Sequence, residues 1–217
     1  MRVSDDRYCR DRLRFDLALR LIGHEARTHT IRIWTGLTED RVRKLYRTYI
    51  TEHPGERITR RRGKSPQRCG FFLRSPRMQQ EAAVLAGLFC MVGIVVRGRR
   101  LDPRALTVTQ GEMLCLAYET YHALVTAPQI SFEHAAFLVL ALSRADEIVL
   151  HHCSGCGALA IADRYTLRTP VCGVCAAAPH ATGGVRGAHG LRIDRPPVPA
   201  AARGTPAPAL LGGTEAG

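Results

Sequence analysis

Two Cys-x-x-Cys pairs constrain the fold of this chain more than any other feature. Cys153 pairs with Cys156 and Cys172 pairs with Cys175, and 15 residues separate the two pairs. This spacing is typical of zinc sites, because two tight turns that each carry two thiolates can supply the four corners of a tetrahedron. We therefore predict one structural zinc ion bound by all four cysteines, with no open position for catalysis.

The residues around these pairs predict how the site is built. Gly155, Gly157 and Gly173 lie in the two turns, where we expect them to let the backbone N–H groups approach the sulfur atoms. Two short strands are expected within residues 158–167, in a zinc segment that directly follows the last helix of the body.

Several alternatives stay open for this region. The cysteine pairs could form two disulfides, carry redox chemistry or hold an iron–sulfur cluster. The other four cysteines are scattered without framework spacing, we expect no secretory signal, and no βαβ context for redox chemistry is apparent. His151 and His152, just before the first pair, could replace a ligand, donate to a sulfur or end a helix. Free cysteines beside a zinc site indicate the cytoplasm.

Positive charge is concentrated in the first third of the chain. The 217 residues carry a net charge of +12. Residues 1–77 hold 20 Lys and Arg against 9 Asp and Glu, whereas residues 78–217 hold 11 against 10. Such a basic region indicates a surface that faces nucleic acid. An anionic membrane surface is the alternative, but no lipidation motif supports it.

Apolar periodicity predicts a mainly α, compact helical body in residues 1–150. Leu13, Leu17 and Leu21 predict a first helix over residues 10–22. The uncharged stretch 82–96 is shorter than the ~20 apolar residues that span a bilayer, so we expect a buried central helix there. This central helix is expected over residues 76–96, and further helices over residues 24–34, 110–126 and 131–150. Leu124 is expected on the inward stripe of the helix over 110–126.

Residues 35–50 predict the turn and second helix of a helix-turn-helix-like unit. Gly36 permits the turn, Thr38 can cap the helix, and Val42 can pack back on the preceding helix. Arg32 stands where this motif usually has a small residue. An ordinary basic helix on a solvated face is the alternative. The exposed residues expected to bind DNA are Arg41, Arg43, Lys44 and Arg47.

Residues 51–77 predict a basic loop that completes a DNA-facing part at about 24–77. Guanidinium groups bind phosphates bidentately, so a loop of this kind can reach a nucleic-acid backbone. A basic loop without a partner is the alternative. The loop residues expected to bind DNA are Arg60, Arg61, Arg62 and Lys64.

The remaining parts of the chain are a short zinc-binding segment and a tail. The zinc-binding segment is expected over residues 151–178. Residues 179–217 are rich in Ala, Pro and Gly and have too little apolar surface to offset the entropy of ordering. We therefore expect a disordered tail.

Together these motifs resemble the FlhC family, a subunit of the bacterial flagellar transcriptional activator. The resemblance covers about residues 13–179 and rests on TGLTEDRVRKLYR, the GKSP loop, the helical middle and HHCSGCG…PVCGVC. It implies a structural zinc on the four cysteines, an FlhD-like partner in a heterohexamer, and binding to promoter DNA that helps RNA polymerase transcribe flagellar operons. The arginines at 60–62 and the long tail depart from the typical family pattern.

The sequence thus favours a cytoplasmic DNA-binding activator that is not an enzyme and does not enter a membrane. A zinc-stabilised interaction subunit without direct DNA contact is one alternative. A nucleic-acid-processing enzyme is another, but its acid–base candidates are scattered and no motif fixes a nucleophile or an open metal position. Those candidates are Glu112, Glu119, His122, Glu133 and His134.

Overall fold

The computed structural model describes residues 6–52, 58–59, 61–96, 98–167 and 171–177, which all lie within one unit of the chain, residues 1–179. These residues form a mainly helical fold with one two-stranded hairpin, as predicted. In chain order the elements are α1 (Asp6–Gly23), α2 (Thr28–Thr35), α3 (Glu39–Glu52), α4 (Gly70–Leu73), α5 (Pro76–Met91), α6 (Val108–Leu124), α7 (Phe132–Arg144), β1 (Ile148–His152), β2 (Leu159–Asp163) and α8 (Gly173–Ala177).

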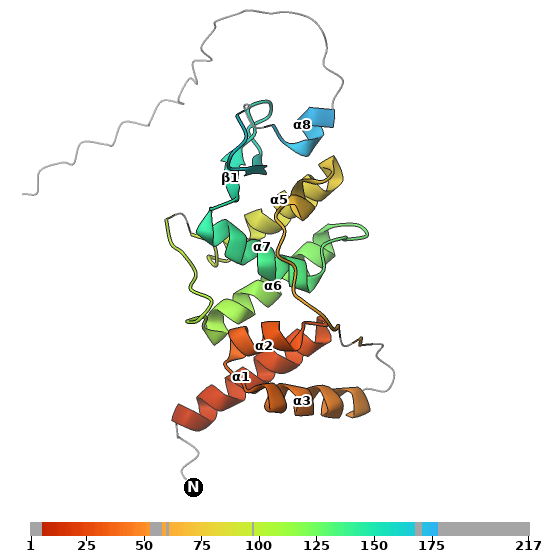
Figure 1. Cartoon of the computed structure of the whole chain (residues 1–217), viewed down its shortest axis with the longest axis vertical. Helices are drawn as coiled ribbons and strands as arrows, with labels where there is room; N and C mark the ends of the chain where they lie inside the picture. Colours follow the sequence, from red (N-terminus) through yellow and green to blue (C-terminus); the bar gives the residue numbers. More distant parts are fainter. Residues whose placement is uncertain (1–5, 53–57, 60, 97, 168–170, 178–217) are drawn as a thin grey trace, which may run out of the picture. The chain divides into compact units, whose positions relative to one another are not determined.

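Helices α1, α2 and α3 pack against one another at one end of this unit (Figure 1). Gly36 ends α2 with a φ of +70°, and its N–H donates to the Arg32 carbonyl at 2.8 Å. Val42 and Tyr46 of α3 are buried against the other two helices. The predicted turn between α2 and α3 is therefore present. The large Arg32 fits there because its side chain is exposed.

Helix α5 is the central helix of the unit and contacts α4, α6, α7, α8 and β2. Its inward residues are almost completely buried, as the uncharged stretch predicts. The helix ends at Met91, not at residue 96, and the Met91 side chain is 82% exposed. Gly93 then turns the chain with a φ of +79°. The buried residues are Met78, Ala82, Leu85, Ala86 and Phe89.

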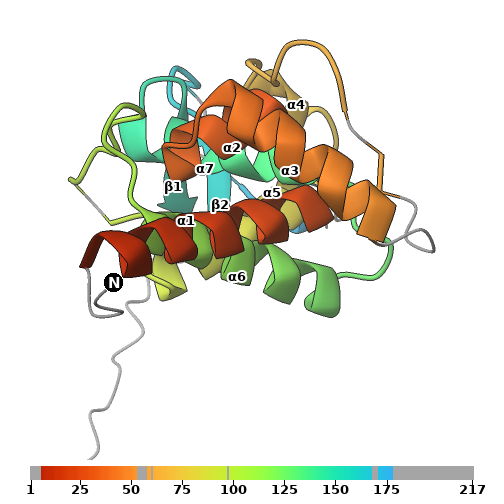
Figure 2. The same ribbon diagram turned by 90° about the horizontal axis from the view of Figure 1, so that it is seen from below.

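Helix α1 runs beside α6, as Figure 2 shows. The contact is close: a Cβ added at Gly111 of α6 would lie 2.5 Å from a methyl carbon of Leu17. Beside it, the Arg20 guanidinium donates to both carboxylate oxygens of Glu119, at 2.6 and 2.8 Å, and also to Glu112. A small residue inside α6 and an ion-pair cluster thus hold the N-terminal helices on the body.

The end of the helical body differs from the prediction of one helix over 131–150. Helix α7 stops at Arg144, because Ala145 adopts a left-handed conformation with a φ of +53°. Strand β1 follows and pairs antiparallel with β2, with Ile148 opposite Asp163 and His152 opposite Leu159. Only β2 lies between the cysteine pairs. The prediction of two strands within 158–167 is therefore wrong, whereas the hairpin does follow the last helix of the body after a short connection.

Other helix boundaries, and the exposure of two leucines, also differ from the predictions. The second helix begins at Thr28 rather than at residue 24, because the connection from α1 includes Glu25 with a φ of +56°. Helix α6 begins at Val108 after a capping box formed by Thr107 and Gln110. Two leucines expected on inward stripes, Leu13 and Leu124, are 56% and 66% exposed, so the prediction that they face inward is wrong.

Two predictions concern residues outside the described ranges. These are the tail at 179–217 and the basic residue Arg60. Within the described ranges, none of the helices combines the length and apolar character that crossing a bilayer requires.

The buried carboxylate of Glu81 ties α5 to α6 and to the turn before α7. It accepts hydrogen bonds from the Tyr121 hydroxyl at 2.5 Å, the Gln129 N–H at 2.8 Å and the Arg77 guanidinium at 2.9 Å. Burial favours the neutral acid, but these donors outweigh it and hold the pKa of Glu81 below its ordinary value. Glu81 therefore stabilises the fold in its charged form, because hydrogen-bond donors of the protein replace the water that it loses on burial.

We predict that Glu81→Ala lowers the free energy of unfolding by about 2–4 kcal/mol, because the buried Tyr121 hydroxyl and the partly buried Gln129 N–H lose their acceptor. The measurement is urea unfolding of both proteins at pH 7. Gln80→Ala, on the exposed side of the same helix, is the control and should change stability by less than about 0.5 kcal/mol. Because the pKa of Glu81 is lowered by folding, its contribution is present at neutral pH and should decline as pH falls below about 4. Equal stability of the two variants would contradict this role.

Candidate metal centre and nucleic-acid interface

The four predicted cysteines come together in one cluster. The sulfur atoms of Cys153, Cys156, Cys172 and Cys175 all lie within 4.8 Å of one another. Sγ of Cys156 and Sγ of Cys172 are 3.7 Å apart, and all four cysteines are free thiols rather than disulfides. Among the described residues this is the only group of three or more His, Cys, Asp or Glu side chains close enough to hold a metal ion. The cluster has the composition and geometry of a metal site.

The first cysteine pair lies in the loop that joins β1 to β2. The Cys153 N–H donates to the Ala158 carbonyl at 2.8 Å, and the Gly157 N–H donates to the Cys153 carbonyl at 2.8 Å. Gly157 has a φ of +73°, which L side chains rarely adopt. The strand pairing and this turn therefore fix the first pair, and the second pair is carried by the start of α8.

Backbone N–H groups point at the sulfurs, as predicted. Sγ of Cys153 accepts from the N–H of Cys172 at 3.1 Å and from that of Gly155 at 3.4 Å. These donors, led by Cys172, lower the pKa of Cys153 to about 6. Hydrogen bonding among the sulfurs, led by Cys156, raises the pKa of Cys175 to about 12. Cys153 therefore forms the thiolate that a metal requires more readily than Cys175 does.

Two glycines serve close packing rather than turn conformation, in contrast to the prediction. Neither Gly155 nor Gly173 has a positive φ. A Cβ at Gly155 would lie 3.2 Å from Sγ of Cys175. A Cβ at Gly173 would lie 2.5 Å from the carbonyl oxygen of Pro76 and 2.8 Å from its Cα, both backbone atoms at the start of α5. Gly173 therefore lets α8, and with it Cys175, rest directly on the central helix.

The two histidines before the first pair lie on β1, not at the end of a helix. Nδ1 of His152 lies 3.1 Å from the Gly157 carbonyl, and Nδ1 of His151 lies 3.0 Å from the His152 carbonyl. Neither belongs to the group that can hold a metal. Their ring nitrogens instead contact backbone carbonyls near the first turn.

Four of the predicted DNA-binding residues lie on the exposed side of α3. Val42 and Tyr46 occupy the buried side of the same helix. Arg43 forms ion pairs with Glu39 at 2.5 Å and with Asp40 at 3.8 Å, so part of its charge is neutralised. The other three form no ion pair within the part of the chain that the structure describes. The exposed basic residues of α3 are Arg41, Arg43, Lys44 and Arg47.

The basic loop is held in place by two carboxylates. Arg61 donates to Glu25 at 2.9 Å and 2.7 Å. Glu133, whose side chain is only 3% exposed, accepts from the Ser65 hydroxyl at 3.0 Å and from the Arg27 N–H at 2.7 Å. The loop residues Arg61, Arg62 and Lys64 are exposed. Sequence reasoning did not identify either carboxylate as a partner of the loop, because the residues that they bind lie 34 or more residues away.

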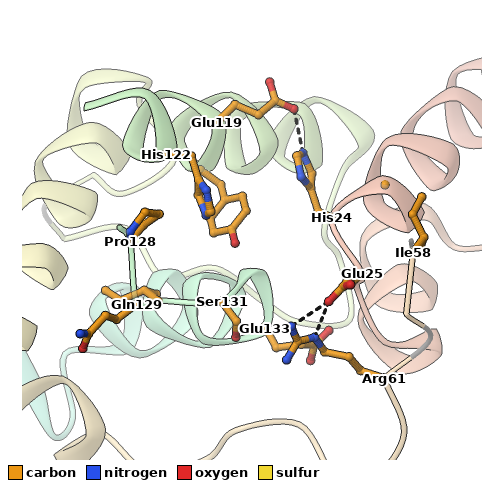
Figure 3. Close-up of a pocket in the computed structure, with 13 residues that line it drawn as sticks. His24, Glu25, Ile58, Arg61, Glu119, His122, Pro128, Gln129, Ser131 and Glu133 are labelled. Carbon is orange, nitrogen blue, oxygen red and sulfur yellow. Dashed lines mark hydrogen bonds and ion pairs between the residues drawn. The ribbon is translucent and has the colours of Figure 1, made fainter. Parts of the chain in front are cut away.

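Three of the acid–base candidates line one cavity of about 670 Å³ between the α1–α2 connection, α6 and the start of α7 (Figure 3). The sequence treats Glu119, His122 and Glu133 as scattered, and the structure corrects this. Glu119 already accepts from Arg20 and lies 2.8 Å from Nε2 of His24. Arg20, followed by His24, keeps the pKa of Glu119 below its ordinary value. Burial, with a smaller effect of His24, lowers the pKa of His122.

These candidates have the contacts of structural groups. Glu133 also accepts from the Thr30 hydroxyl at 3.0 Å, and Glu112 accepts from Arg20. The ring of His134 stacks on Phe71 with a centroid distance of 3.8 Å, and its Nδ1 lies 2.8 Å from the Ser131 hydroxyl. A general base needs an acceptor that substrate can reach. Here the carboxylates are occupied by the protein's own donors.

Comparisons of the chain with protein-family models and with curated proteins gave no match.

We predict that Gly173→Ala weakens metal binding about 10–100-fold, in the range seen when the residues that support metal ligands are changed. The added methyl group would clash with the Pro76 backbone and push α8 and Cys175 away from α5. Metal affinity can be measured by competition with a chromophoric zinc indicator. Val174→Ala is the control, because Val174 lies on the same helix but is 57% exposed. Unchanged affinity in Gly173→Ala would show that the contact with α5 does not position the site.

Proposed function

We propose that the four-cysteine cluster holds one structural zinc ion. Tetrahedral zinc with bonds of about 2.3 Å to sulfur separates the sulfur atoms by about 3.8 Å. The 3.7 Å between Sγ of Cys156 and Sγ of Cys172 agrees with this geometry. Four sulfurs complete the coordination, so the ion would join the hairpin to α8 and would leave no position for a substrate.

We further propose that the protein is the DNA-binding subunit of a cytoplasmic transcriptional activator. The observation that carries this proposal is the two-sided character of α3. Its buried side packs on α1 and α2 through Val42 and Tyr46, while its opposite side exposes Arg41, Lys44 and Arg47 without ion pairs among the described residues. A helix that follows a tight turn and exposes cations in this way suits the major groove and its phosphates.

The resemblance to the FlhC family supplies the finer proposal. On that basis the chain acts with an FlhD-like subunit in a heterohexamer and helps RNA polymerase transcribe from flagellar promoters. The loop with Arg61, Arg62 and Lys64 adds a second basic element, positioned by Glu25 and Glu133. Phosphate contacts by both elements would release counterions and make binding depend on salt.

A subunit that only docks a partner is the second candidate function. A groove of about 430 Å³ between α5, β2 and α8 is lined mainly by apolar residues. Met91, Leu124 and Val174 in this groove are 82%, 66% and 57% exposed. Exposed apolar surface of this kind marks interaction sites. The groove therefore favours a protein partner whether or not the chain itself touches DNA.

We predict that replacing Arg41, Lys44 and Arg47 together by Gln weakens DNA binding and reduces its salt dependence. Each lost phosphate contact should reduce the slope of log affinity against log salt by about 0.9. The measurement is fluorescence anisotropy with a duplex promoter fragment, for the chain alone and with its co-purified partner.

Arg99→Gln is the control, because Arg99 is an exposed cation in the connection between α5 and α6. It should leave affinity and slope unchanged. If the triple variant binds DNA as the wild type does, α3 is not the DNA contact. If, in addition, the wild-type chain binds DNA only together with its partner, the docking-only function is correct. Wild-type binding that does not depend on salt would exclude the electrostatic account.

We predict that Cys153→Ala and Cys172→Ala yield protease-sensitive or insoluble protein. Structural zinc supplies about 10–16 kcal/mol of apparent binding free energy that is coupled to folding. Metal analysis and limited proteolysis give the measurement, and Cys9→Ala, an exposed cysteine on α1, is the control. A stable metal-free variant with normal partner assembly would contradict the structural role.

A further inference from the structure

A small basic hollow adjoins the predicted DNA-binding helix at Glu39 and joins residues of α2 to two of the predicted loop arginines, Arg61 and Arg62. Its volume is about 280 Å³, and it is bounded by the first turn of α2, the first turn of α3 and the loop at 61–63. Four arginines and one histidine line it together with the carboxylate of Glu39, and two of the arginines, Arg27 and Arg61, also pair with the carboxylates of Glu133 and Glu25. The lining residues are Arg27, Thr28, His29, Arg32, Glu39, Arg61, Arg62 and Gly63.

We propose that this hollow binds one phosphate group of the nucleic-acid backbone, with His29, Arg32 and Arg62 as the contacting side chains. This inference rests on the proposed DNA-binding function and assigns a specific subsite to it. Of these three residues, only Arg62 is expected from the sequence to bind DNA. The other two come from α2, which the sequence treats only as the helix against which α3 packs.

The walls of the hollow are already held in position. Two bonds to Glu25 fix the Arg61 guanidinium, and the Arg27 guanidinium donates to the Lys64 carbonyl. Nε of Arg27 is buried and has no hydrogen-bond partner among the described residues. Arg62 forms no ion pair among the described residues and Arg32 pairs there only with Glu39, so an anion in the hollow would meet these two cations between walls that need little further ordering.

The position in the fold favours a backbone phosphate over other anions. In helix-turn-helix proteins the first helix meets the DNA backbone while the second enters the groove. The hollow lies at the start of α2 and adjoins the start of α3 through Glu39. It therefore lies where α2, the start of α3 and the basic loop meet. A phosphate there would join the two basic elements along one DNA strand.

Glu39 opposes this binding and sets its strength. Its carboxylate lies 3.8 Å from the Arg32 guanidinium and 2.5 Å from that of Arg43. A phosphate has to compete with this carboxylate for the same arginines. Removing the charge of Glu39 should therefore release two cations and strengthen DNA binding, whereas an ordinary helix-stabilising ion pair would give no such gain.

The test compares Arg32→Gln, Arg62→Gln and Glu39→Gln in the full-length chain, by anisotropy with duplex DNA across a salt series. Each arginine variant should reduce the log–log salt slope by about 0.9 without changing sequence preference. Glu39→Gln should bind about two- to fivefold more tightly, the range of a solvent-exposed ion pair. Arg99→Gln is the control that leaves both quantities unchanged.

The outcomes separate this inference from the function on which it rests. If the α3 triple variant loses affinity while Arg32→Gln and Arg62→Gln match the wild type, the hollow is not a phosphate site and the DNA-binding function stands. If the wild type shows no salt-dependent DNA binding, both fail. Tight binding of inorganic phosphate or a mononucleotide, followed by the ring resonances of His29, would assign the hollow to a free ligand and overturn the backbone site.

Discussion

The apolar side of α5 is the contact that positions α4, α6, α7 and the cysteine-bearing segment, and α1 and α2 are held on the body through α6. It receives α6 and α7 on its buried face, β2 along its length and α8 at its first residue, where Gly173 lies against the Pro76 backbone. Burying side chains such as Leu85 and Phe89 contributes roughly 1.5–3 kcal/mol each. The cysteine cluster cannot assemble without this helix, because α8 carries the second cysteine pair and has only five residues of its own.

Local patterns explain what the sequence could predict. Cysteine spacing identifies the cluster because a zinc-binding turn is built from neighbouring residues. The turn before α3 follows from Gly36, and the burial of Val42 and Tyr46 follows from helical periodicity. By contrast, the short apolar run before the first cysteine fits a buried helix or a strand equally well. Pairing with β2 makes this run a strand. In addition, Ala145 ends α7 in a left-handed conformation that is usually signalled by Gly or Asn in the sequence.

Interactions between distant residues could not be predicted from one sequence. Glu133 resembles an acid–base candidate when only its type is known. In the structure it is a buried acceptor for the Arg27 N–H and for the hydroxyls of Thr30 and Ser65, which come from α2 and the loop. Counting charges has the same weakness. Arg20, Arg43 and Arg61 add to the positive total of the first third, yet carboxylates neutralise all three. The effective basic surface is therefore smaller and more localised than composition indicates.

The arrangement of contacts separates the role of the metal from that of the basic surface. Helix α3 packs on α1 and α2, whereas the hairpin and α8 pack on α4, α5 and α7, and the two regions lie at opposite ends of the described unit (Figure 1). A metal ion at the cysteines therefore has no direct electrostatic access to Arg41 or Lys44, since charges separated by more than a Debye length of about 8–10 Å are largely screened. The metal can therefore influence α3 only through packing contacts. Helix α5 packs on α6, and α6 packs on α1 through Gly111 and through the ion pairs of Arg20. If α3 binds DNA as proposed, loss of metal would therefore act on that binding by destabilising the body as a whole, not by changing the charge of the helix.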